Sequence, residues 1–131
     1  MIVLDTSAAI ELTLALPLSR RVQQRLEEDE WQIAAPQLLS VEVLQVLRRR
    51  VAAGLTTLAQ AEEARELLRD LNIRFFDHDT LVDRVWRLRD NLTAYDACFV
   101  VLAELLDSEL VTTDVRLARA PGHDARVVLV Q

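Results

Sequence analysis

Short apolar runs alternate with longer amphipathic segments along this chain of 131 residues. An apolar run that is too short for a helix predicts a strand, and apolar residues that recur at helical spacing predict a helix. We therefore expect strands at about residues 2–4, 32–34, 74–76, 109–112 and 126–129.

Helices are predicted over most of the remaining chain. One begins near Ser7, and the others cover about residues 19–28, 36–53, 57–71, 80–88 and 93–106, followed by a short turn at 115–120. The helix at 36–53 is the most clearly marked, because Pro36 stands in its first turn and Gly54 just past its end. Strands that alternate with helices predict an α/β domain around a mostly parallel sheet of about five strands.

The composition fits one domain spanning residues 1–131, because 51% of the residues are hydrophobic and can fill a core. No apolar run approaches the length of about 20 residues that spans a bilayer, and the N-terminal segment lacks the features of a signal peptide. We expect a soluble, cytoplasmic protein. Cys98 is the only cysteine, which excludes a disulfide scaffold and cysteine-based zinc binding and indicates a small core residue.

Four acidic residues stand where burial would normally exclude a charge. Two of them, Asp5 and Asp114, each follow a predicted strand and precede a predicted helix. In an open α/β sheet such positions line the crevice where ligands bind, so the two carboxylates share that crevice if their strands are neighbours. Each also fits a helix N-cap without any function, because Asp, Ser and Thr are the preferred capping residues.

The other two acids are Asp96 and Glu42. Asp96 comes three residues after Thr93, as in a capping box, although the positive end of a helix also favours an ionised carboxylate that binds a metal. Glu42 lies between Val41 and Val43, inside the apolar stripe of its helix. A lone glutamate in a core tends to be protonated, so the edge of a metal crevice explains this position better.

Together the four acids predict a metal site made only of oxygen ligands, which selects Mg²⁺ or Mn²⁺ over zinc. Many of the remaining acids cluster in solvated runs such as residues 27–30. His78 and His123 stand in polar, loop-like contexts, and we expect them at the surface rather than among the ligands.

The net charge of −6 argues against a protein that coats nucleic acid through a broad basic surface. All 15 basic residues are arginines, which suit bidentate contacts with phosphate, so the composition is compatible with an RNA or DNA substrate. The absence of lysine argues against receiver domains and haloacid-dehalogenase-like phosphatases, which normally use a lysine beside the phosphoryl group. It also excludes a P-loop nucleotide hydrolase, whose motif requires one.

In their order and spacing, the acids and their surroundings resemble the PIN-domain ribonucleases, specifically the VapC-type toxins of bacterial toxin–antitoxin pairs. The matching segments span nearly the whole chain: Ile2-Val-Leu-Asp5-Thr-Ser-Ala8, Pro36-Gln-Leu-Leu-Ser-Val-Glu42-Val-Leu-Gln-Val-Leu-Arg48, Leu92-Thr-Ala-Tyr-Asp96-Ala97 and Val111-Thr-Thr-Asp114-Val-Arg-Leu-Ala118. One position departs from the family, since many relatives carry asparagine or serine where Gln45 stands.

The resemblance implies a PIN-like three-layer α/β/α sandwich and a Mg²⁺-dependent endoribonuclease, with Mn²⁺ as a substitute, that leaves a 5′-phosphate and a 3′-hydroxyl. Its catalytic and metal-binding quartet comprises Asp5, Glu42, Asp96 and Asp114. We expect Asp5 and Asp96 to hold the principal ion, and the other two acids to complete its shell or to hold a second ion. A water bound to the metal then attacks the scissile phosphate.

Supporting roles follow from position. We expect the hydroxyl groups of Thr6, Ser7 and Thr113 to orient carboxylates or water, with capping as the alternative, and Arg116 to reach a substrate phosphate. The helices around residues 38–47 and 99–106 are apolar nearly all round, which predicts a homodimer interface as well as a core. The resemblance also implies a small cognate antitoxin, and the acidity of the chain suits a basic segment of such a partner.

Two alternatives keep the fold and change the function. The first is a PIN-type nuclease in RNA processing or DNA flap cleavage, outside any toxin pair. The second is a PIN-like binding module that has lost catalysis, which the complete set of four acids disfavours.

Overall fold

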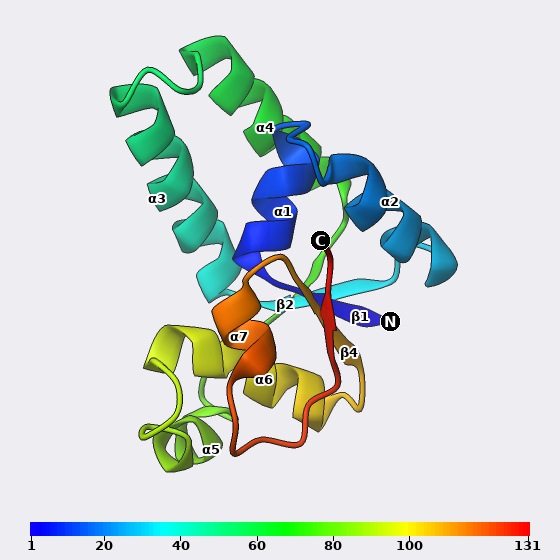
Figure 1. Ribbon diagram of the computed structural model, residues 1–131, viewed down its shortest axis with the longest axis vertical. Helices are drawn as coiled ribbons and strands as arrows, with labels where there is room; N and C mark the ends of the chain where they lie inside the picture. The colour runs from blue at the N-terminus through cyan, green and yellow to red at the C-terminus, as the bar shows by residue number, and fades with distance from the viewer.

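The computed structural model describes residues 1–131 and contains a five-stranded sheet in which every neighbouring pair of strands is parallel (Figure 1). The strand order is β3-β2-β1-β4-β5, so β1 lies at the centre. The strands are β1 (Ile2–Leu4), β2 (Ile33–Pro36), β3 (Arg74–Phe76), β4 (Glu109–Thr112) and β5 (Val127–Leu129). This arrangement confirms the predicted α/β class.

Seven helices form the two outer layers. The connections from β1 to β2 and on to β3 carry α1 (Thr6–Thr13), α2 (Ser19–Glu28), α3 (Leu38–Ala52) and α4 (Leu58–Asp70). The return to β4 and β5 carries α5 (Val82–Arg87), α6 (Ala94–Leu105) and α7 (Val115–Arg119). Parallel crossovers are right-handed, so reversing direction at β1 places the second group of helices on the opposite face, as Figure 1 shows.

The start of α3 differs from the prediction. Pro36 ends β2, where it is in register with Phe76 of β3, and the helix begins two residues later at Leu38. The missing N–H of Pro36 is tolerated here because the hydrogen bond to β3 comes from the next residue, whose N–H (Gln37) donates to the Phe76 carbonyl at 2.9 Å. The predicted end of this helix is confirmed, because Gly54 has φ +72 and the Leu55 N–H closes the last turn on the Arg50 carbonyl at 3.0 Å.

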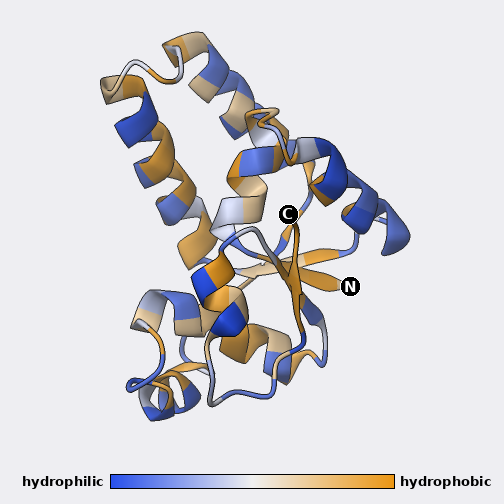
Figure 2. Cartoon of the chain, in the orientation of Figure 1, coloured by the Kyte–Doolittle hydropathy of each residue, from blue (hydrophilic) through white to orange (hydrophobic).

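The core lies on both faces of the sheet. The three residues of β1 are completely buried, and the strands and α6 are largely hydrophobic, whereas α2 is mostly hydrophilic (Figure 2). Helix α6 packs against β1, β2 and β4 and against α5, so its nearly continuous apolar surface is used inside the molecule. The expectation that α6 offers an apolar surface to a dimer is wrong for the middle of this helix, and its exposed apolar side chains are Tyr95 and Leu105, by 63% and 58%, near its two ends.

On α3, by contrast, Val41 and Leu44 are exposed by 64% and 49%, so the prediction of an apolar dimer surface now rests on this helix. None of the helices combines the length and the apolarity that crossing a bilayer requires.

The division of α6 between core and surface gives a test. Phe99→Ala removes a ring that is 1% exposed, and we expect it to lower the free energy of unfolding by about 3–5 kcal/mol. Leu105→Ala on the same helix should change it by no more than about 0.5 kcal/mol. Urea denaturation measures both values. A loss for Leu105→Ala that depends on protein concentration would instead place the end of α6 in a subunit interface.

Candidate active site

The carboxyl ends of β1 and β4 are the position at which an open α/β sheet of this topology places its ligand crevice, because the chain leaves these two neighbouring strands toward opposite faces of the sheet. Leu4 is in register with Val111, and the Asp5 N–H donates to the Val111 carbonyl at 3.0 Å. Asp5 and Asp114 therefore stand at the same edge, as the sequence predicted for neighbouring strands.

Asp5 is held firmly at this edge. The residue is 6% exposed, and its Oδ2 accepts hydrogen bonds from the Ser7 N–H at 3.3 Å, the Ser7 hydroxyl at 2.6 Å and the Thr112 hydroxyl at 2.8 Å. The contact with the Ser7 N–H is also the N-cap of α1, so capping and a role in the site are compatible. All three donors reach the same oxygen, which leaves Oδ1 free of protein hydrogen bonds and fixes the direction of the carboxylate.

The two hydroxyl groups also connect the loops that follow β1 and β4. Thr112 Oγ1 accepts from the Asp114 N–H at 3.0 Å, and Ser7 Oγ accepts from the Thr113 N–H at 3.0 Å. Each hydroxyl has one proton, and both protons are directed at Asp5. The hydroxyl of this strand that orients a carboxylate thus belongs to Thr112 and not, as expected, to Thr113, which contributes its backbone N–H.

Glu42 lies in the second turn of α3 and faces α1, where its Oε1 accepts a hydrogen bond from the Thr6 hydroxyl at 2.8 Å. Partial burial raises the pKa of Glu42 above its ordinary value. The hydrogen bond from Thr6 opposes this rise, and the charges of Asp5 and Asp96 add to it. Three of the four acids therefore lie within electrostatic reach of one another.

Asp96 lies in the first turn of α6, where its N–H donates to the Thr93 hydroxyl at 3.1 Å. Burial is again the largest cause of a raised pKa, followed by the charges of Asp5 and Asp114, while Thr93 and Arg116 act in the opposite direction. Asp114 caps α7 by accepting from the Arg116 N–H at 2.8 Å. The structure thus brings all four predicted acids into one electrostatic neighbourhood.

The acids do not form a finished set of metal ligands. No three His, Cys, Asp or Glu side chains are gathered closely enough to hold an ion as they stand. Their chemistry nevertheless fits a hard divalent cation, because the donors are carboxylate oxygens. Burial, and after it mutual repulsion, raises the pKa values of Glu42 and Asp96, and a positive charge relieves that repulsion. Mg²⁺ keeps several waters and needs few direct protein ligands.

Arg116 is the one cation that acts on these carboxylates. Its side chain is 92% exposed, and its Nη2 lies 3.8 Å from Asp114 Oδ2, so the ion pair is loose. An exposed pair of this kind constrains the guanidinium weakly. The Arg116 guanidinium is therefore accessible from solvent, and its contact with a substrate phosphate stays a prediction.

The histidines lie outside the acidic cluster, whereas Cys98 borders it, close enough to be affected by the charge of Glu42. His78 Nε2 accepts from the Leu38 N–H at 3.1 Å and so satisfies one of the free donors at the start of α3. No local sequence signal predicts this contact, since the two residues are 40 positions apart. Burial and the charge of Glu42 raise the pKa of the Cys98 thiol, which makes it a poor nucleophile.

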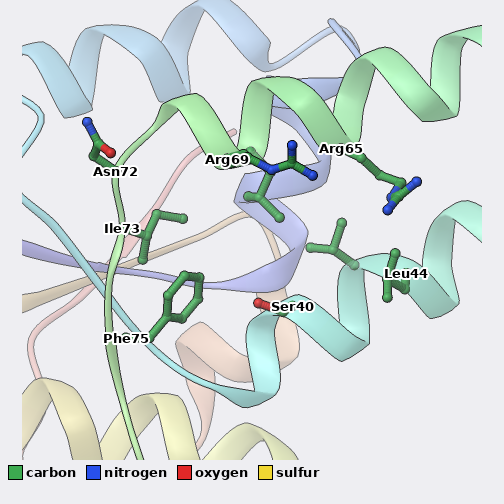
Figure 3. A pocket seen from close by; sticks show the side chains of 9 residues that line it. Ser40, Leu44, Arg65, Arg69, Asn72, Ile73 and Phe75 are labelled. Atoms are coloured by element: carbon green, nitrogen blue, oxygen red, sulfur yellow. The ribbon is translucent and has the colours of Figure 1, made fainter.

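A separate hollow of about 330 Å³ lies between α3, α4 and β3, and Figure 3 shows its lining side chains. It is on the side of α3 that faces away from Glu42, it contains no acidic residue, and Arg65 and Arg69 project from α4 at its rim. We call it the α3–α4 groove, and its lining comprises Ser40, Val43, Leu44, Arg65, Leu68, Arg69, Asn72, Ile73 and Phe75. Its apolar character suits docking rather than hydrolysis.

Comparisons with known proteins agree with this geometry. The profile of the PIN domain family matches residues 2–123. Ribonuclease VapC12 of Mycobacterium tuberculosis strain H37Rv is 35% identical over 130 residues, which is 99% of each chain. Ribonuclease VapC1 of the same strain is 42% identical over 98 residues, which is 74% of each chain.

Solved structures show the same fold at low sequence identity. VapBC2 from Rickettsia felis, bound to a promoter DNA fragment, aligns over 100% of both chains with a TM-score of 0.73 and 15% identity. PAE2754 from Pyrobaculum aerophilum aligns over 89% of this chain and 83% of its own, with a TM-score of 0.66 and 23% identity. The three-layer α/β/α arrangement is therefore shared with these proteins.

The buried hydroxyl of Thr112 gives a first test of the site. Thr112→Val leaves the Asp114 N–H without its partner and removes one donor from Asp5, so we expect a loss of about 1–3 kcal/mol in the free energy of unfolding. Thr113→Val makes the same chemical change one residue away and should cost no more than about 0.5 kcal/mol. Equal losses in urea denaturation would contradict the assignment of the hydroxyl network to Thr112.

The raised pKa of Glu42, caused first by burial and then by the charges of Asp5 and Asp96, gives a second test, made in EDTA. A raised pKa means that the folded state binds the proton better, so the stability of the metal-free wild type falls as the pH rises from about 4.5 through the raised value. Glu42→Gln cannot ionise and should be the more stable protein at pH 7, with the difference shrinking toward pH 4. Thermal unfolding across this range measures it. Exposed Glu63→Gln is the control, and an equal gain there would refute the explanation.

Proposed function

This chain belongs to the PIN domain family, and from that premise we propose that it is a Mg²⁺-dependent endoribonuclease acting as the toxin of a toxin–antitoxin pair. The observation that carries the proposal is the electrostatic neighbourhood of four carboxylates at the crevice between β1 and β4. Maintaining four acids against their mutual repulsion is the usual mark of a functional site.

The relatives support the choice of reaction. Several are named VapC ribonucleases, and the similarity to VapC12 covers 99% of both chains, so it includes every segment that carries a quartet residue. The fold is also that of VapBC2 and of a toxin–antitoxin complex from Klebsiella pneumoniae, which aligns with a TM-score of 0.67 and 21% identity. RNA is accordingly the substrate that we assign to the crevice.

In this proposal Asp5 and Asp96 hold the principal Mg²⁺ or Mn²⁺ ion, and Asp114 and Glu42 complete its surroundings. When bound, such an ion supplies an activated water and offsets the charge that develops on the phosphoryl oxygens. Asp5 is suited to this role because Ser7 and Thr112 fix its Oδ2 and leave Oδ1 free.

At Glu42 and Asp96, binding of a cation competes with protonation. Glu42 and Asp96 have raised pKa values, so binding of a cation at these groups is coupled to the release of any proton they carry. Thr6 holds Glu42 toward the cluster by its 2.8 Å hydrogen bond. Arg116, loosely paired with Asp114, is positioned to contact a phosphate oxygen of the RNA beside the carboxylates.

The partner in this proposal is a small antitoxin that inhibits the enzyme. The α3–α4 groove supports such a partner, since its apolar lining and its two rim arginines suit an amphipathic segment that also carries acidic side chains. The carboxylate cluster itself suits a basic side chain of the same partner. The exposed Val41 and Leu44 support a homodimer through α3.

Cleavage of RNA by the purified protein tests the reaction. Asp5→Asn and Asp96→Asn should each lower the rate in Mg²⁺ by at least about 100-fold, because loss of a group that merely supports a metal ligand typically costs 10–100-fold. EDTA should abolish cleavage by the wild type. Asp83→Asn, an exposed acid on α5, is the matched control and should retain full activity. Undiminished cleavage by the Asp5→Asn, Asp96→Asn double variant would exclude the proposed role of the quartet.

A further inference from the structure

A second hollow, of about 540 Å³, opens beside the acidic cluster. One wall is α7 with the residues that follow it, and the other is the segment of residues 91–93 that leads into α6. Asp96 belongs to its lining, so the hollow begins at the carboxylates and extends away from them. Its volume falls within the range of about 300–1,000 Å³ that small-molecule sites occupy.

The wall contributed by α7 is positively charged. Arg116 and Arg119 both line the hollow, and they are three residues apart on the helix, which makes them neighbours on one face. Arg119 is exposed, and its side chain makes no ion pair or hydrogen bond within the protein. The two adjacent guanidinium groups are paired weakly or not at all with acidic groups of the protein, so they suit consecutive phosphates of one nucleic-acid strand.

The rest of the lining is mixed in character. Leu92, Val115 and Pro121 provide apolar surface, while Asn91 and Thr93 provide polar side chains. A nucleotide combines an anionic phosphate, a polar sugar and a flat base, and therefore matches a hollow that offers charged, polar and apolar contacts together. A purely apolar ligand would leave the arginines unused.

A glycine stands where the loop after α7 approaches the segment that leads into α6. Gly122 has φ +89, and a Cβ at this position would lie 2.2 Å from Asn91 Nδ2. The absence of a side chain lets the loop after α7 approach Asn91 closely. The loop after α7 thus comes close to the side chain of Asn91 next to Pro121, and both of these residues line the hollow.

We propose that this hollow binds one nucleotide of single-stranded RNA next to the phosphodiester that is cleaved, with Arg119 and Arg116 on its phosphates. The inference rests on the proposed ribonuclease function and specifies its substrate. An unpaired strand is required, because the bases of a duplex are paired and stacked and cannot enter a hollow of this kind, whereas unstacked bases can be splayed into it.

The salt dependence of RNA binding tests the subsite without any cleavage. We expect a fluorescein-labelled oligouridylate, titrated in EDTA and followed by anisotropy, to bind Arg119→Ala with a slope of log K against log[salt] that is about 0.7 shallower than for the wild type. For the Arg116→Ala, Arg119→Ala double variant, the slope of log K against log[salt] should be about 1.4 shallower than for the wild type. Arg119→Lys keeps the charge and should keep the slope. Arg20→Ala, an exposed arginine of α2 on the other face of the sheet, is the matched control and should also keep it.

A second measurement locates the strand. Oligouridylate carrying 4-thiouridine, irradiated with the wild type in EDTA, should crosslink to peptides that contain Leu92 or residues 115–121. Crosslinks confined to α2 or α4 would overturn the subsite, and so would a slope for Arg119→Ala that equals the wild-type slope. If Arg119→Ala reduced the salt slope for duplex RNA as much as for the single strand, the preference for a single strand would be overturned.

The outcomes separate this inference from the function on which it rests. If the wild type cleaves RNA in Mg²⁺ and Arg119→Ala binds RNA as the wild type does, the subsite alone is refuted. If the wild type neither binds RNA at low salt nor cleaves it, the subsite and the proposed ribonuclease function are both refuted. If Arg119→Ala left RNA binding unchanged and weakened only the complex with an antitoxin, the hollow would be a protein-docking site and the proposal would be wrong.

Discussion

The parallel pairing of β1 with β4 is the interaction on which the candidate active site depends. These strands are separated by about a hundred residues of sequence, yet their register brings the Asp5 N–H to the Val111 carbonyl and sets the two following loops side by side. The hydroxyl groups of Ser7 and Thr112 then tie both loops to one oxygen of Asp5. A shift of this register would separate Asp5 from the hydroxyl that orients it.

The acids gathered by this pairing carry an electrostatic cost that the protein leaves largely uncompensated. Burial and mutual repulsion raise the pKa values of Glu42 and Asp96, and the only opposing cation is an arginine that is almost fully exposed. Packing alone gives no reason to place these charges together. A fold that accepts such a cost at the crevice between its central strands has traded stability for a site that attracts cations.

Much of this arrangement could be predicted from the sequence because its signals are local. Asp5 and Asp114 each follow a strand directly, and Asp96 stands at a capping distance from Thr93, so their places at element ends could be inferred. Contacts between distant segments could not be inferred in this way. The roles of Thr112 and of His78 at the start of α3 depend on which segments meet in space, and the sequence predicts a helix at Pro36 because the pairing of this residue with β3 is not visible in sequence.

Helix α3 joins two regions that share no residue. Glu42 faces the carboxylates, while Leu44, two positions along and so about 200° around the helix, faces the α3–α4 groove. His78 holds the first turn of the helix through Leu38, and the other end extends away from the sheet (Figure 1). The acidic cluster and the α3–α4 groove are therefore built on opposite sides of one rigid helix, so the placement of α3 sets the position of Glu42 and the shape of the groove together.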